Sequence, residues 1–214
     1  MRGVMLWGAA AGLAVAGCGE RAPTLPDDPV QKAATCGVVA AATERAKAGA
    51  KGDLPVEAQE RIFQYALLAG STGGHFDAER ANAVSAAMPG LFDTTIKGKW
   101  QTLQPACAQA FPATAQTTPT LPDRKVDSLL QCYVLVDFTR KALAGAGASY
   151  SEQAVRLGSY AAKLDGQLSP LLGGAKGDAL QTRRNDALAK VAGLGQPPAV
   201  LEACEAKYPS AQPS

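Results

Sequence analysis

Apolar residues recur every three or four positions along most of the chain, which is the pattern of amphipathic helices. Examples are the stretches 30–41 and 56–67, each of which places its apolar residues on one helical face. The glycine-rich stretch 70–74 and the pair Pro89-Gly90 interrupt the pattern. Such residues end helices, so we expect a series of short helices with a break or kink at Pro89-Gly90.

One stretch departs from this one-sided pattern, because residues 129–138 are apolar on nearly every side. A strand is the alternative interpretation, since Tyr133 to Phe138 is rich in strand-forming residues. Three of the six corresponding residues 37–42 of the first copy, defined below, are alanine, which favours a helix over 126–144. A helix that is apolar all round is usually buried on all sides, so we expect this one to lie between two parts of the protein.

The chain contains an internal duplication. Pro23-Thr24-Leu25-Pro26-Asp27 returns as Pro119-Thr120-Leu121-Pro122-Asp123, displaced by 96 positions, and Cys36 matches Cys132 at the same offset. Further along the offset becomes 97, where Ala106-Cys107 matches Ala203-Cys204. Chance similarity between alanine-rich helices would explain matched alanines, but not a repeated proline motif with cysteines at both ends of each copy.

The expected fold class is all-α, with two tandem repeats of a roughly four-helix, disulfide-closed unit. The low aromatic content of 6% and the abundance of alanine also favour close-packed helices. We divide the chain into a signal peptide (1–17), a lipid-anchored tether (18–29), helical repeat 1 (23–112), a linker (113–118), helical repeat 2 (119–209) and a disordered tail (210–214).

Four cysteines remain for disulfides if Cys18 serves another purpose. Four cysteines allow three connectivities. The duplication favours Cys36–Cys107 with Cys132–Cys204, which would join the first and last helices of each unit. Pairing Cys36–Cys132 with Cys107–Cys204 is the symmetric alternative.

The N-terminal residues have features of a targeting signal. Arg2 precedes an apolar run over 4–16, and the run ends in Val15-Ala16-Gly17-Cys18. This resembles the lipobox of bacterial lipoproteins, which implies that Cys18 is lipidated and becomes the mature N-terminus. The alternatives are an ordinary secretory signal with an incidental cysteine, or a buried N-terminal helix. Gly19 follows where enterobacterial lipoproteins kept in the inner membrane have aspartate, so we expect an outer-membrane anchor with the folded part in the periplasm.

Candidate chemistry is sparse. His75, the only histidine, stands close to Asp77 and Glu79, which together form a weak candidate metal site. The simpler interpretation is a polar loop with Asp77 capping a helix. Glu57 and Glu60 lie one helical turn apart and could act as acids in hydrolysis, although acidic residues in a first turn usually compensate the helix dipole.

Charge and composition limit the classes of partner that this protein is expected to bind. The formal net charge is +2, and no block of Lys and Arg exists that would grip phosphates, which argues against nucleic acid. We expect no cofactor, a membrane contact through Cys18, and an envelope protein or cell-wall component as partner. A duplicated unit offers two similar faces or one groove between them.

The leading functional prediction is therefore a non-catalytic binding or scaffold lipoprotein on the periplasmic side of the envelope. The first alternative is a cell-wall glycan hydrolase that uses Glu57 or Glu60. The second is a periplasmic chaperone or immunity-type protein, because the expected architecture is loosely similar to HdeA-type chaperones and to secreted-toxin immunity proteins.

Overall fold

The protein is helical throughout its described part. The computed structural model describes residues 24–49 and 52–210, so the expected signal peptide over 1–17, Cys18 and residues 211–214 of the expected tail lie outside it. The described residues form eight α-helices and four short 3₁₀ turns, with no strand among them, which confirms the all-α class. The turns are Trp100–Leu103, Pro112–Ala115, Ala148–Tyr150 and Ser169–Leu172.

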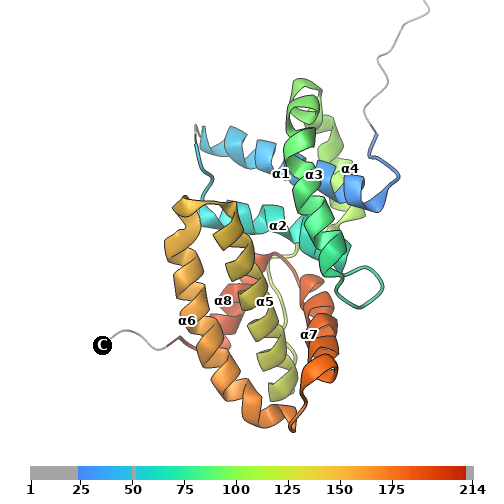
Figure 1. The fold of residues 1–214 in the computed structure, drawn as a ribbon. Coiled ribbons are helices and arrows are strands. Elements are labelled where there is room, and N and C mark those ends of the chain that lie inside the picture. The colour runs from blue at the N-terminus through green and yellow to red at the C-terminus, as the bar shows by residue number, and fades with distance from the viewer. Residues whose placement is uncertain (1–23, 50–51, 211–214) are drawn as a thin grey trace, which may run out of the picture.

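The helices divide along the chain into two sets of four (Figure 1). The first set is α1 (Pro29–Ala48), α2 (Val56–Gly70), α3 (Ala78–Lys97) and α4 (Gln104–Ala110). The second set is α5 (Lys125–Ala146), α6 (Ser151–Leu168), α7 (Gly177–Ala192) and α8 (Pro197–Lys207). Within each set the first helix packs against the other three.

Several features of the two sets correspond in position. Helices α1 and α5 begin at residues 29 and 125, 96 positions apart, and α4 and α8 end at residues 110 and 207, 97 positions apart. The residues that follow α4 and α8 have nearly the same backbone, with φ −130° and ψ 66° at Phe111 and φ −134° and ψ 69° at Tyr208. Asp28 caps α1, whose first residue is Pro29, by accepting a hydrogen bond from the Gln31 amide, 2.8 Å away.

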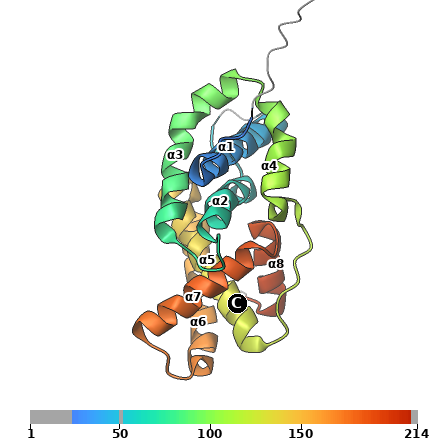
Figure 2. The ribbon, with the colours of Figure 1, turned by 90° about the vertical axis from the view of Figure 1, so that its right-hand side faces the viewer.

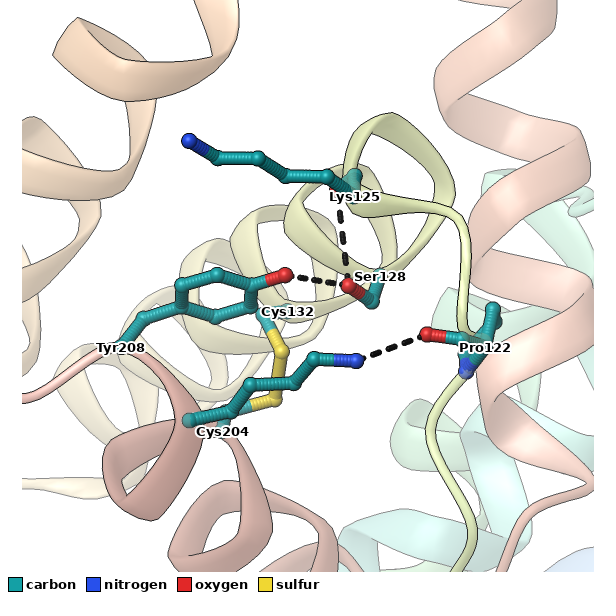
Figure 3. The surroundings of a disulfide bond; sticks show 7 residues. Pro122, Lys125, Ser128, Cys132, Cys204 and Tyr208 are labelled. Atoms are coloured by element: carbon teal, nitrogen blue, oxygen red, sulfur yellow. Dashed lines mark hydrogen bonds between the residues drawn. A yellow bond between two sulfur atoms is a disulfide. The ribbon is translucent and has the colours of Figure 1, made fainter.

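The two disulfides join Cys36 to Cys107 and Cys132 to Cys204. This is the connectivity that the duplication favours, and it excludes the cross-linked alternative. Each bond ties the first helix of a set to its last helix, and all four cysteines are buried. Figure 3 shows the disulfide between Cys132 and Cys204, with Ser128, Tyr208 and Pro122 of the second motif near it.

That proline motif is held in place by α8. The Lys207 amine donates to the Pro122 carbonyl oxygen at 2.8 Å, and the hydroxyl groups of Ser128 and Tyr208 are hydrogen-bonded to each other (Figure 3). Leu121 in the second motif and Leu25 in the first pack against the apolar core. Each occurrence of the motif thus packs against the core directly before a helix, α1 in the first case and α5 in the second.

A single large apolar core extends through both sets of helices. Helix α2 lies across the second set and packs against α5, α7 and α8 (Figures 1 and 2). Helix α5 is buried by α6, α7 and α8 on its own side and by α2 on the other. This confirms that the stretch that is apolar all round is a helix and that it lies between the two parts.

At two places the local structure differs from what the sequence suggests. Helix α3 continues through Pro89-Gly90 to Lys97, so the helix is not broken there. Proline removes one backbone hydrogen bond, to the carbonyl four residues earlier, and here that residue, Ser85, is exposed, so water can replace the lost donor. Ser149 and Glu152 have the sequence spacing of a capping box, but α6 has no side-chain cap. The Ser149 hydroxyl donates instead to the Asp53 carboxylate across the interface.

Candidate functional site

A groove of about 840 Å³ lies between the two sets of helices. Its walls are α2 and α3 from the first set and α5 and α7 from the second. Apolar side chains form much of the lining, including Ile62, Phe63, Phe76, Met88, Val134, Phe138 and Leu188. Polar and charged side chains also line it, including Gln59, Asn82, Asp137, Lys141, Gln181, Arg184 and Asn185.

Phe76, in the loop that precedes α3, lines the groove and contacts the second set of helices. Its ring packs edge-on against Phe138, with the ring centroids 5.8 Å apart. Its backbone amide donates to the Asn185 carbonyl oxygen at 3.2 Å. Edge-to-face aromatic pairs stabilise a contact beyond the area they bury, so this junction fixes the distance between the walls.

Corresponding positions of the two repeated segments give the groove different kinds of side chain, apolar in one case and charged or aromatic in the other. Gly37 and Met88 are in contact, because a methyl group placed on Gly37 would lie 2.3 Å from Met88 Cε. Adding 96 to both numbers gives Tyr133 and Arg184, which are also in contact: the guanidinium carbon of Arg184 lies 5.0 Å from the Tyr133 ring centroid. Met88, Tyr133 and Arg184 all line the groove, so one copy supplies an apolar pair and the other a cation on an aromatic ring.

The charges of the groove do not all cancel. Burial opposes ionisation of Asp137, but hydrogen bonds from Lys141 and Arg140 outweigh it and lower the Asp137 pKa. The corresponding distances are 2.7 Å to Lys141 and 2.8 Å to Arg140. Arg184 is less well satisfied, because its nearest carboxylate oxygen, on Asp165, is 3.6 Å away. Its buried Nε has no hydrogen-bond partner in the described part of the chain.

The structure does not assemble a metal site from His75, Asp77 and Glu79. His75 Nδ1 lies 2.7 Å from the Asp186 carboxylate, and its Nε2 lies 3.2 Å from the Asn185 amide nitrogen, both on α7. Asp77 caps α3 by accepting a hydrogen bond from the Arg80 amide at 3.0 Å, as the simpler interpretation predicts. No group of three or more potential metal ligands occurs within residues 24–49 and 52–210.

Glu57 and Glu60 occupy different environments, and neither lines the groove. Glu57 is exposed, whereas Glu60 is only 3% exposed. Burial, reinforced by the charge of Glu57, raises the pKa of Glu60 to about 7. Arg156 and Arg61 oppose this rise, and Glu205 adds to it.

The sequence alone did not identify the residues that line the groove, because Arg184 stands beside Arg183 in a polar stretch that is typical of a solvated helix face. Arg184 could have been identified by comparing the two repeated segments, in which Gly37 and Met88 correspond to Tyr133 and Arg184.

No family profile, curated protein or solved structure matches this chain. Within the described residues, no helix has the length and hydrophobicity needed to cross a membrane.

Proposed function

We propose that this protein is a lipid-anchored, non-catalytic binding protein of the bacterial envelope and that its ligand lies in the groove between the two sets of helices. The groove is the observation that carries this proposal. Its volume falls in the range of about 300–1,000 Å³ that is usual for ligand pockets, and it combines apolar walls with a few polar groups, as such pockets do.

The location rests on two independent features. The Val15-Ala16-Gly17-Cys18 sequence resembles the lipobox of bacterial lipoproteins, and several acyl chains on one residue would anchor the protein stably. The two buried disulfides support export, because such bonds persist in oxidising compartments and are rare in the cytosol. The expected result of Cys18→Ser is loss of acyl labelling and of the mature membrane-bound form, measured by mass spectrometry and membrane fractionation.

We infer that the two sets of helices arose by duplication of one disulfide-closed, four-helix unit. The matched helix starts and ends, the matched caps at Phe111 and Tyr208 and the two within-set disulfides support this inference. Superposition of an experimental structure of residues 24–112 on residues 119–209 tests it: helices that fail to overlay would contradict it. In this view the groove is the junction between two diverged copies.

Groove occupancy is tested with a photoreactive long-chain alcohol bound to the full-length protein in phosphatidylcholine nanodiscs. Labelled peptides from α2, α3, α5 and α7 are the expected result. Ser85→Trp would project a large ring from a lining position of α3 and reduce the labelling. Ala86→Trp is the matched control, because Ala86 is also exposed on α3 but does not line the groove. Equal labelling of both variants, or labelling confined to other segments, would contradict the proposal.

A second candidate function, hydrolysis of cell-wall glycan, has one observation in its favour. A carboxyl with a pKa of about 7 is suited to general acid catalysis near neutral pH, and Glu60 has such a pKa. Its position outside the groove lining favours the binding protein instead. Zymography on peptidoglycan separates the two: lysis that Glu60→Gln abolishes would support the hydrolase.

A further inference from the structure

We propose that the ligand of the groove is a single-chain amphiphile with an anionic head group, whose head lies at Arg184 and whose hydrocarbon chain extends toward Met88. This inference rests on the proposed function, because it assumes that the groove is the binding site. It adds the chemical class and the orientation of the ligand.

The groove has two ends that can be placed by their contacts. Met88 packs against the small cluster formed by Leu54, Ala58 and Ile62. The Tyr150 hydroxyl, just beyond the end of α5, donates to the Leu54 carbonyl oxygen at 2.9 Å. The Met88 end therefore lies beside the C-terminal part of α5, whereas Arg184 contacts Tyr133 near the opposite end of the α5 wall.

The distance between these ends suits a long acyl chain. The α5 residues that line the groove run from Tyr133 to Ala146. A helix rises about 1.5 Å per residue, so this wall is roughly 20 Å long. Toward its C-terminal end the lining residues are Ala142, Gly145 and Ala146, and Gly145 has no neighbour within 4 Å of an added methyl group. Small side chains leave room there, and a hydrocarbon chain requires no hydrogen-bond partners.

The Arg184 end is suited to an anion. The groove lining contains Asp137, Lys141 and Arg184 as its charged residues, so its formal charge is −1 + 1 + 1 = +1. Asp137 is already neutralised by Arg140 and Lys141. The guanidinium of Arg184 lies over the Tyr133 ring, and its ion pair with Asp165 is long, at 3.6 Å. Arginine binds carboxylates and phosphates through several donors at once. Gln181 and Asn185 also line the groove, but their amide nitrogens already contact Asn185 Oδ1 and His75 Nε2.

The test uses three photoreactive probes with the same acyl chain and different heads: a carboxylate, a neutral hydroxyl and a trimethylammonium. Each is titrated against the full-length protein in phosphatidylcholine nanodiscs, and labelled peptides are identified by mass spectrometry. The carboxylate probe is expected to bind most tightly. Arg184→Gln should weaken it about tenfold, the effect of one charge-assisted hydrogen bond, and should change the hydroxyl probe less than twofold.

Two further variants keep the test decisive. Lys190→Gln removes one positive charge from the same helix at a position outside the groove lining, and it should leave all three affinities unchanged. Arg184→Lys retains the charge and should recover part of the carboxylate affinity. Equal binding of the three heads, a preference for the cationic head, or an equal loss of all probes in Arg184→Gln would overturn the anionic assignment alone. Absence of groove labelling by every probe would instead overturn the proposed binding function. Displacement of the probes by apolar peptides but not by fatty acids would assign the groove to a peptide ligand.

Discussion

Gly70 and Gly166 stand 96 positions apart near the ends of α2 and α6, but only Gly70 is in close contact with another part of the chain. A methyl group on Gly70 would lie 2.7 Å from the Phe76 ring and 2.9 Å from the Asp77 carbonyl oxygen. Gly166 is exposed and has no neighbour within 4 Å of such a group. The loop that positions Phe76 in the groove therefore packs directly on the backbone of α2.

The same substitution should have opposite effects at these two glycines. Gly70→Ala should destabilise the protein by about 1–3 kcal/mol, because the loop backbone must move. Gly166→Ala should stabilise it by about 0.5–1 kcal/mol, because alanine is the better helix former and meets no obstacle. Urea unfolding with both disulfides intact measures the difference. A stabilising Gly70→Ala would mean that the loop does not pack as described.

The two disulfides should each contribute a large share of stability. They join residues 71 and 72 positions apart, and closing a loop of this length is worth about 4 kcal/mol in the chain-entropy model. Replacing Cys36 and Cys107 together by serine should lower the free energy of unfolding by about this amount, and replacing Cys132 and Cys204 should do the same. Because all four cysteines are buried, a reductant without denaturant should leave native protein resistant to thiol alkylation. Rapid alkylation under native conditions would contradict this.

The helices and the cysteine pairs could be predicted because both depend on the local sequence pattern and on its repetition. The motif that contains Asp27 and returns at Asp123 stands directly before α1 and before α5. The match of Cys36 with Cys132 then makes pairing within each copy the simplest symmetric choice. Neither inference requires knowledge of how the two copies pack against each other.

The errors and omissions arise where the copies meet. Ser149 has the spacing of a helix cap, but Asp53 of the other copy accepts its hydrogen bond. The groove is lined by four helices, and their relative orientation depends on side-chain packing across the interface. Arg184 therefore looks like a solvated residue in the sequence, although in the structure it lies on Tyr133.

Gln64 links the two sets of helices through a polar contact in the core. It is 1% exposed, and its amide nitrogen donates to the Gly195 carbonyl oxygen at 2.9 Å and to the Ala113 carbonyl oxygen at 3.2 Å. Gln64→Leu should destabilise the protein by about 1–3 kcal/mol, because it removes the donor from these two carbonyl groups. Gln101→Leu, at an exposed position, is the control and should change stability little.

Hydrogen exchange should locate the effect of Gln64→Leu. The segments around Ala113 and Gly195 are joined by a backbone hydrogen bond from the Gln196 amide to the Gln116 carbonyl oxygen, 2.8 Å long. Faster exchange at Gln196 is expected in the variant, because the contact beside this bond is lost. Unchanged exchange at Gln196 together with faster exchange throughout α2 would indicate a general loss of packing rather than loss of this link.

Glu60 should make the protein less stable as the pH rises from about 4.5 to about 7. Burial raises its pKa to about 7 in the folded state, from an ordinary value of 4.5. Below pH 4.5 both states carry the proton, and no penalty arises. Between pH 4.5 and 7 the unfolded chain releases the proton while the folded protein retains it, so the folded state is progressively disfavoured. The full difference corresponds to roughly 3 kcal/mol above pH 7.

Glu60→Gln should remove this penalty, because glutamine resembles the protonated carboxyl in size and does not ionise. The variant should therefore be more stable than the original protein at pH 8 and nearly equal to it at pH 4.5. Urea unfolding at half-unit pH steps measures both curves, and Glu202→Gln, an exposed position on α8, serves as the control. Arg156 and Arg61 face Glu60 with opposite charge, while Glu57 and Glu205 repel it. A variant less stable than the original at pH 8 would mean that the two arginines outweigh burial and that Glu60 is ionised in the folded protein.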